Sequence, residues 1–287
     1  MQPMRYSVAA PMPFPTRTAA AIAIVVAAAG AATALWPRRN APARLEGVAA
    51  VRAMLWHSLQ PVTLEGCRLE RYGEANDGGY LVCGNLLADV AAGYSYGISG
   101  YDGWGCEVST TLRVPVHQYD CFNLNAPVCA GGATAFHGEC IGREAATIDG
   151  RPYDTLEHQL ARNGHGDARI VMKIDVEGAE WDVFATAPDD VLERIDQLVV
   201  EFHRTDERRF LSVVQRLAQY FHVANLHMNN HACSAGDQPF GAWAYEVLFV
   251  NKRLPVTAGA PRTPVFAALD EPNDGTRPDC QTAPPAR

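Results

Sequence analysis

The chain lacks several features that would place it in common functional classes. No two cysteines are separated by two residues, which argues against a structural zinc site of the usual kind. Basic residues are scarce, since 24 Lys and Arg stand against 32 Asp and Glu and the net charge is -8. Phosphate binding needs a basic face, so we do not expect nucleic acid as a partner. No internal repeat is present, so the chain is not a repeat protein.

All eight cysteines, from Cys67 to Cys280, lie after the apolar N-terminal segment, and none lies before or within it. An even number of cysteines behind an apolar N-terminal segment favours disulfides formed in an oxidising compartment. The alternative is a set of reduced, buried thiols in a cytosolic domain. Asn76-Asp-Gly-Gly79 is a strong turn sequence between two apolar runs and predicts a hairpin. Cys67 and Cys83 flank this hairpin and could pair across it.

The N-terminal region differs in composition from the rest of the chain and is treated as a separate segment. After a tail over residues 1–17, residues 18–36 (Thr18 to Trp36) carry no charge and are mostly alanine. Nineteen residues can just span the hydrocarbon core of a membrane, so we expect a single-pass anchor. A cleaved signal peptide with a cleavage site at Ala32-Thr33-Ala34, or an Ala-rich segment outside any membrane, are the alternatives. Arginines flank the segment on both sides, so the positive-inside rule does not decide its orientation.

The 287 residues suffice for one α/β domain of roughly 200 residues with extensions, and a hydrophobic content of 48% supports a core. Residues 37–64 read as a linker with an amphipathic helix, 65–253 as the domain, and 254–287 as a disordered Pro- and Ala-rich tail. The expected strands of the domain span 94–97, 114–119, 135–137, 170–174, 197–203, 222–226 and 245–251. No helix separates the last two strands, so we expect them to pair antiparallel at the sheet edge.

The stretch from Arg169 to Trp181 is the most informative part of the chain. Its buried strand runs directly into Asp175, Glu177 and a third acid. In an open α/β sheet, ligands bind beyond the carboxyl ends of the parallel strands, so these carboxylates are expected at an active site. An exposed loop that happens to be acidic is the alternative.

A second constellation lies earlier in the chain. A short strand enters a glycine-rich loop with Gly97 and Gly100, and the next strand ends at Asp120, 23 residues after Gly97. This layout is typical of sites for adenosine-containing cofactors, because glycines let the backbone approach the ligand and the acid binds ribose hydroxyls. The antiparallel ending and the acid-tipped fourth strand favour a class I S-adenosylmethionine methyltransferase over a dinucleotide dehydrogenase.

Residues 173–181, Lys-Ile-Asp-Val-Glu-Gly-Ala-Glu-Trp, resemble the signature of FkbM-type methyltransferases. The chain resembles more closely a related group of methyltransferase-like proteins, through residues 77–83, 94–98 and 199–203. The resemblance covers about residues 65–252. It implies a Rossmann-like class I methyltransferase sheet, mostly parallel with an antiparallel strand at one edge, that uses S-adenosylmethionine. The chain departs from the pattern at Cys121, where relatives have a proline, and at Trp104-Gly-Cys106 in the glycine loop.

Asp175 is the first candidate for holding or deprotonating an acceptor hydroxyl, and His203 is the second. Asp175 also belongs, with Gly97, Gly100 and Asp120, to the expected cofactor site. Glu177 is either a third catalytic residue or the cap of the helix beginning near Ala179. Weaker candidates for substrate binding are Asp77, Glu201, Asn229 and His231. We expect no metal; if one binds, its ligands are expected to be Asp175, Glu201 and His203, which suit magnesium or manganese only partly.

The resemblance thus predicts an O-methyltransferase that acts on a hydroxyl of a glycan or small metabolite. The apolar N-terminal segment predicts that this enzyme is held at a membrane. A non-catalytic binding or scaffold domain on the same fold, and a nicotinamide-dependent oxidoreductase, are the rival interpretations. The cysteines place the domain outside the cytoplasm, anchored or secreted after signal cleavage, whereas S-adenosylmethionine is made in the cytosol. The sequence names no specific substrate and no oligomeric state.

Overall fold

A computed structural model of the chain describes residues 46–261 and 269–283. The segment 18–36, for which the sequence predicts a membrane anchor or signal peptide, lies outside these residues, as does the tail before it. Within the described ranges, no helix is long and apolar enough to cross a membrane.

Seven strands form the central sheet, in the order β12-β13-β11-β10-β4-β5-β6. They are β4 (Ala92–Tyr96), β5 (Val116–Tyr119), β6 (Thr134–His137), β10 (Ile170–Ile174), β11 (Ile195–His203), β12 (Phe221–Met228) and β13 (Ala244–Asn251). The strands from β11 through β6 pair in parallel, whereas β13 is antiparallel to both β11 and β12. The predicted antiparallel pairing of the last two strands is confirmed. The antiparallel strand itself lies second from the edge, because β12 occupies the edge position.

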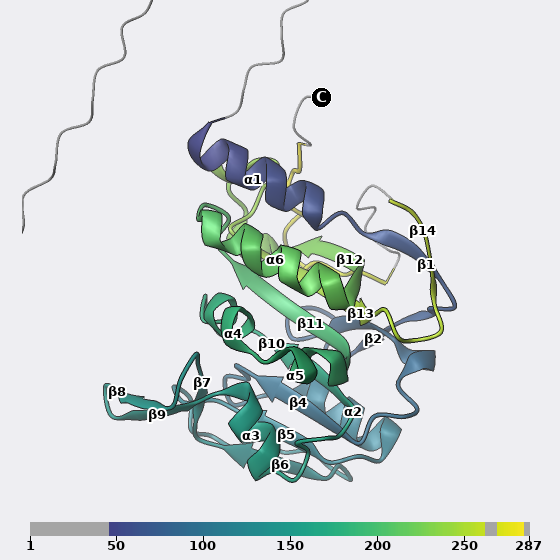
Figure 1. Ribbon diagram of the computed structural model, residues 1–287, viewed down its shortest axis with the longest axis vertical. Coiled ribbons are helices and arrows are strands. Elements are labelled where there is room, and N and C mark those ends of the chain that lie inside the picture. The colour runs from purple at the N-terminus through teal and green to yellow at the C-terminus, as the bar shows by residue number, and fades with distance from the viewer. Residues whose placement is uncertain (1–45, 262–268, 284–287) are drawn as a thin grey trace, which may run out of the picture. The chain divides into compact units, whose positions relative to one another are not determined.

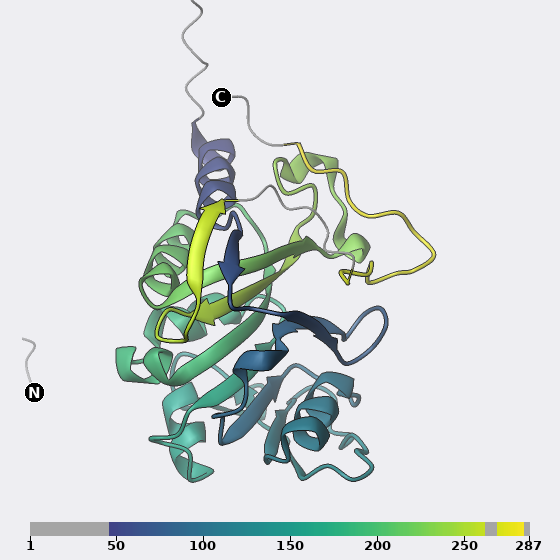
Figure 2. The ribbon, with the colours of Figure 1, turned by 90° about the vertical axis from the view of Figure 1, so that its right-hand side faces the viewer.

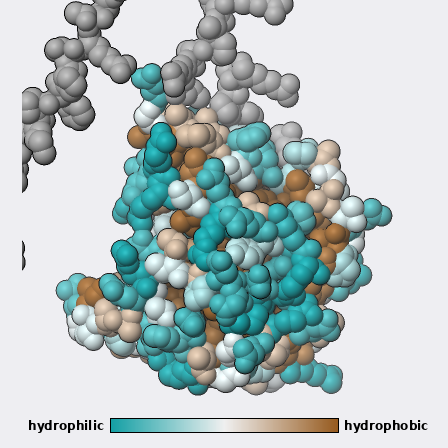
Figure 3. All heavy atoms as spheres, viewed as in Figure 1, coloured by the Kyte–Doolittle hydropathy of each residue, from teal (hydrophilic) through white to brown (hydrophobic). Residues whose placement is uncertain are grey.

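Helices cover one face of this sheet (Figure 1). They are α1 (Gly47–Ser58), α3 (Leu156–Arg162), α4 (Glu180–Thr186), α5 (Asp189–Arg194) and α6 (Arg208–Tyr220). In α6, Phe210, Val213, Val214 and Leu217 follow helical spacing and are all buried against the sheet. The surface on this side is mainly hydrophilic, with apolar residues in small separate patches (Figure 3). The apolar face of α6 is therefore buried against the sheet and is not exposed to solvent.

Mostly strands and loops cover the opposite face (Figure 2). The helix α2 (Gly103–Leu112) packs there beside the hairpin of β2 (Leu69–Tyr72) and β3 (Tyr80–Cys83). The predicted turn at Asn76 to Gly79 thus joins two paired strands. A small sheet of β7 (Cys140–Ile141), β8 (Ala146–Ile148) and β9 (Arg151–Asp154) is inserted between β6 and α3. Short 3₁₀ turns span Gly84–Leu86, Asn230–Ala232 and Ala235–Asp237.

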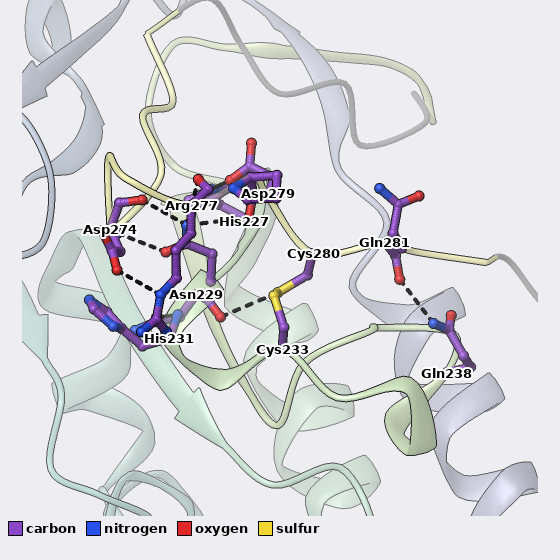
Figure 4. The surroundings of a disulfide bond; sticks show 12 residues. His227, Asn229, His231, Cys233, Gln238, Asp274, Arg277, Asp279, Cys280 and Gln281 are labelled. Carbon is purple, nitrogen blue, oxygen red and sulfur yellow. Dashed lines mark hydrogen bonds and ion pairs between the residues drawn. A yellow bond between two sulfur atoms is a disulfide. The ribbon is translucent and has the colours of Figure 1, made fainter.

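The region after residue 254 differs from the expected disordered tail. Strand β14 (Thr257–Pro261) pairs antiparallel with β1 (Val62–Glu65). Residues 269–283, which we call the C-terminal strap, run across β12 and the loop that follows it (Figure 4). Within the strap, the backbone N–H of Asp274 donates a hydrogen bond to Asn230 Oδ1 at 2.7 Å. Composition alone predicted disorder here, and specific polar contacts order the strap instead.

All eight cysteines form disulfides: Cys67–Cys83, Cys106–Cys129, Cys121–Cys140 and Cys233–Cys280. The predicted pairing across the hairpin is confirmed. The last bond fastens the strap to the loop after β12 (Figure 4). Four disulfides are typical of proteins that mature in an oxidising compartment.

Candidate functional site

The carboxyl ends of four neighbouring parallel strands carry the predicted site residues. Gly97 follows β4, Asp120 follows β5, Asp175 follows β10, and His203 is the last residue of β11. Because these strands are adjacent in the order β11-β10-β4-β5, their ends meet at one edge of the sheet. The sequence prediction that these four residues share one site is consistent with this arrangement.

Gly97 has a positive φ of 72°, and its position leaves no room for a side chain. A Cβ there would overlap the carbonyl oxygen of Asp175, whose backbone N–H donates to Tyr96 O at 3.1 Å. The side chain of Lys173 donates to Gly97 O at 2.9 Å. The close approach that requires this glycine is therefore made by the end of β10, and the glycine fixes the distance between the two strand ends.

Asp120 has most of its acceptor capacity occupied by its own surroundings. One oxygen accepts from the backbone N–H of Ser99 at 2.7 Å, and the other accepts from those of Phe122 at 2.8 Å and Asn123 at 2.9 Å. An ionised carboxylate offers about four acceptor positions, so about one remains for a ribose hydroxyl. The carboxylate fits an adenosine-containing cofactor, and it also holds the glycine loop in place.

Asp102 is an important residue of the glycine loop that the sequence reasoning missed. It is buried and accepts from Ser95 Oγ at 3.0 Å, Gly105 N at 2.8 Å and Gln118 Nε2 at 2.8 Å. It thereby joins β4, β5 and the first turn of α2. An Asp three residues before a helical backbone N–H is an N-cap signal, and this pattern could have identified it.

His203 is held in one orientation by groups on α4. The Glu180 side chain is fully buried, and its Oε1 lies 3.1 Å from His203 Nδ1 while accepting the His203 backbone N–H at 2.8 Å. Glu180 Oε2 accepts from Gly178 N at 2.9 Å. Trp181 Nε1 donates to the carbonyl of His203 at 2.6 Å. A hydrogen on Nδ1 therefore points at Glu180, and Nε2 faces the open side of the site.

Three carboxylates surround Nε2 of His203. The nearest oxygens belong to Glu177 at 3.5 Å, Glu201 at 3.7 Å and Asp175 at 3.9 Å. Glu177 reaches this position from a left-handed backbone conformation, with φ at 57°. Such strain in a residue with a side chain is found preferentially at functional sites. The expected role of Glu177 as a helix cap is not fulfilled, because the N-cap of α4 is Ala179 with no side-chain cap.

Burial and charge shift the titration of this cluster. Burial raises the pKa of Asp175, although Lys173 and His203 oppose the shift. Burial, with the nearby charge of Asp175, raises the pKa of Glu201 well above its usual range. Burial lowers the pKa of His203, but the hydrogen bond and charge of Glu180 and the carboxylates facing Nε2 outweigh it, so that the pKa is raised overall. Perturbed pKa values of this kind mark the cluster as a candidate functional site.

The weaker candidates Asn229, Asp77 and His231 differ in what they contact. Asn229 donates to Glu201 Oε1 at 2.8 Å and so belongs to the cluster. Asp77 lies at the hairpin turn and accepts from Asn273 of the strap at 3.2 Å. His231 is exposed, and its backbone N–H donates to Asn229 Oδ1. Among the described contacts, those of Asn229 join it to the cluster, those of Asp77 join it to the strap, and none joins the His231 side chain to the cluster.

A cavity of about 440 Å³ lies at the other end of the strands. Arg169 and Arg194, which line it, directly precede β10 and β11. Ligands of open α/β sheets bind at the carboxyl ends, so we assign the chemistry to the His203 edge and not to this cavity.

The mostly parallel sheet, with helices on one face, fits a Rossmann-like α/β fold. No family model and no curated protein matches the chain. Among solved structures, it is similar to the methyltransferase FkbM from Methylobacillus flagellatus KT, with a TM-score of 0.39 and 13% identity over 56% of this chain and 44% of that one. It is also similar to a protein described as an S-adenosylmethionine-dependent methyltransferase from Listeria monocytogenes, with a TM-score of 0.32 and 8% identity over 59% of this chain and 96% of that one. The chain thus spans less than half of the FkbM chain, and similarity at this level assigns no activity.

Proposed function

We propose that the chain is an S-adenosylmethionine-dependent methyltransferase that methylates a hydroxyl of a glycan or small metabolite. The observation that carries the proposal is the meeting of a glycine loop, a loop-fixing acid and a histidine with three carboxylates at one sheet edge. Gly97, Gly100 and Asp120 would hold the cofactor. When bound, the cofactor supplies an electrophilic methyl group.

The residues at the ends of β10 and β11 would serve the acceptor. A hydroxyl is a poor nucleophile until its proton is removed, and a positioned base contributes typically 10²–10⁴-fold. Asp175 is the first candidate for that base, because no described residue donates a hydrogen bond to its carboxylate and it is partly exposed. His203 is the second, because Glu180 fixes its ring as the buried carboxylate does in a Ser-His-Asp triad.

The site also has an aromatic wall for an acceptor. The ring of Trp243 lies 5.9 Å from that of His203 between centroids, and 45% of this residue is exposed. A half-exposed indole beside a candidate base offers a flat apolar surface with a polar edge, which suits a ring-shaped hydroxylated acceptor such as a sugar.

We further propose that the domain is extracytoplasmic, held by residues 18–36 or secreted after their removal. The four disulfides support this placement. Counting free thiols in protein from its native membrane tests it. We expect none, and eight reactive thiols would make the placement untenable.

Isothermal titration of the full, disulfide-intact chain with S-adenosylmethionine tests the enzyme proposal. We expect saturable binding that weakens at least about tenfold in Asp120→Asn, because a lost charge-assisted hydrogen bond costs roughly 1.5–3 kcal/mol. Asp167→Asn is the matched control, since Asp167 is exposed before β10, and it should bind as the wild type does. If the wild type does not bind the cofactor, the chain is a non-catalytic domain or uses another cofactor, and a parallel titration with NADH separates these outcomes.

A further inference from the structure

The geometry of the His203 cluster points to a divalent cation site, and we propose that Asp175, Glu177 and His203 bind one such ion. One ligand atom from each of the three residues lies within 4.8 Å of the other two. This inference goes beyond the proposed function, because methyl transfer itself requires no metal.

The distances between the ligand atoms suit a common ion. His203 Nε2 lies 3.5 Å from Glu177 Oε2 and 3.9 Å from Asp175 Oδ1. Two ligand atoms that bind one octahedral ion at about 2.1 Å are about 3.0 Å apart when adjacent and about 4.2 Å when opposite. The observed separations fall between these limits. They are also too long for strong hydrogen bonds, so His203 is in ion-pair contact with the two carboxylates without a hydrogen bond to either.

The histidine is an independent indication, because it is aimed into the cluster from the protein interior. His203 is only 4% exposed, and among the described residues none makes a hydrogen bond to Nε2. Its other nitrogen is bonded to the buried Glu180. Metal-binding histidines almost always donate their second ring N–H to a carboxylate or carbonyl, which fixes the tautomer and leaves the ligating nitrogen free.

Asp175 and Glu177 each direct one carboxylate oxygen toward Nε2 of His203. Lys173 approaches Oδ2 of Asp175 at 3.7 Å, whereas Oδ1 is the oxygen that faces His203. Lys173 is itself bonded to the carbonyls of Tyr96 and Gly97. The Glu177 side chain is 83% exposed, so an ion can enter from solvent and keep water ligands on that side. Glu201, which accepts a hydrogen bond from Asn229, lies 3.7 Å from Nε2 of His203 and is not one of the three ligands.

Two carboxylates and one imidazole with open positions suit manganese or a similar divalent transition metal better than an all-oxygen calcium site. Such an ion would lie where we place the acceptor hydroxyl. It could bind that hydroxyl and lower the pKa of its proton, as bound metal ions do for water.

Manganese binding to the full, EDTA-dialysed chain without cofactor tests this inference, with free Mn²⁺ measured by electron paramagnetic resonance. We expect one saturable site. Glu177→Gln should weaken binding at least about tenfold, since even residues behind the ligands change metal affinity 10–100-fold. This exchange keeps the size of an exposed side chain, so the fold should be unaffected.

Glu193→Gln is the matched control, because Glu193 is an exposed glutamate just before β11, at the opposite end of the strand from His203. It should leave binding unchanged. The absence of saturable binding, or equal binding by the wild type and Glu177→Gln, would overturn the proposal. Equal losses in Glu177→Gln and Glu193→Gln would do the same, since they would indicate diffuse attraction to an acidic surface. Because the cofactor is absent, none of these results depends on methyl transfer.

Discussion

His227 on β12 should make the stability of the protein depend on pH in a defined window. Its side chain is 1% exposed, and its ring nitrogens lie 3.5 Å from Glu246, 3.9 Å from Asp270 and 3.5 Å from Asp279. Burial lowers the pKa of His227, but these carboxylates outweigh it and raise the pKa to about 9 from its ordinary value of 6.5. The folded protein therefore holds a buried histidinium between β13 and the strap (Figure 4).

The difference between the two pKa values corresponds to about 3 kcal/mol of stability, at 1.36 kcal/mol for each pH unit. Because the folded pKa exceeds the unfolded one, this contribution is complete below pH 6.5 and is lost as the pH rises through about 9. Urea unfolding of the disulfide-intact chain at pH values from 6 to 9.5, followed by tryptophan fluorescence, measures it. In His227→Gln, the decrease in the free energy of unfolding between pH 6 and 9.5 should be about 3 kcal/mol smaller than in the wild type.

His222→Gln is the control, because His222 lies on the same strand but burial lowers its pKa. The contribution of His222 to the free energy of unfolding changes only below pH 6.5. The unfolding free energy of His222→Gln should therefore vary with pH as that of the wild type does from pH 6.5 to 9.5. Parallel curves for the wild type and His227→Gln between pH 6.5 and 9.5 would refute the reasoning. The three carboxylates would then not keep a proton on His227.

Two further changes test the strap and the strand ends. Replacing Cys233 and Cys280 together by serine opens a loop with a sequence separation of 47 and should lower the free energy of unfolding by about 4 kcal/mol, measured by urea unfolding. An unchanged urea midpoint would show that the strap stays docked without its bond. Gly97→Ala must part β4 from β10 and adopt a positive φ, so we expect a loss of about 2–6 kcal/mol together with weaker cofactor binding. A variant as stable as the wild type would contradict the close approach to Asp175.

The sequence predicted the parts of the fold that local patterns specify. The strand before Asp175 is a short apolar run that leads directly into its acids, and β13 is a largely apolar run as well. Since parallel strands end at a common edge, the sequence also predicted that His203 and Asp175 lie near each other. The prediction needed only the order of the elements and no side-chain geometry.

The remaining features depend on contacts between residues that are distant in sequence. Asp270 accepts a hydrogen bond from Asn225, 45 residues away, and nothing in a Pro- and Asp-rich segment indicates such a partner. Glu180 is the third acid of the motif, and only its burial shows that it orients His203. The sequence predicts Gly97 as a cofactor glycine, and only the structure shows that the end of β10 also approaches it too closely for a side chain.

A row of buried polar residues shows why residue types alone cannot separate a structural cluster from a functional one. Glu201, Glu246 and His227 lie opposite one another on three adjacent strands, and His203 is two residues beyond Glu201. Both ends of the row therefore carry a histidine among carboxylates.

At the His227 end, amides satisfy the carboxylates, since Asn225 donates to Asp270 at 2.6 Å and Asn273 donates to Glu246 at 2.7 Å. The strap closes over that end, where one ligand atom each of His227, Glu246 and Asp270 also lies within 4.8 Å of the others. At the His203 end, no described residue donates a hydrogen bond to the carboxylate of Asp175, and Glu177 faces solvent. Carboxylates that lie beside a fixed imidazole and receive no hydrogen bond from a described residue can take up a proton, a hydroxyl or a cation, and for this reason we propose the His203 end as the reactive one.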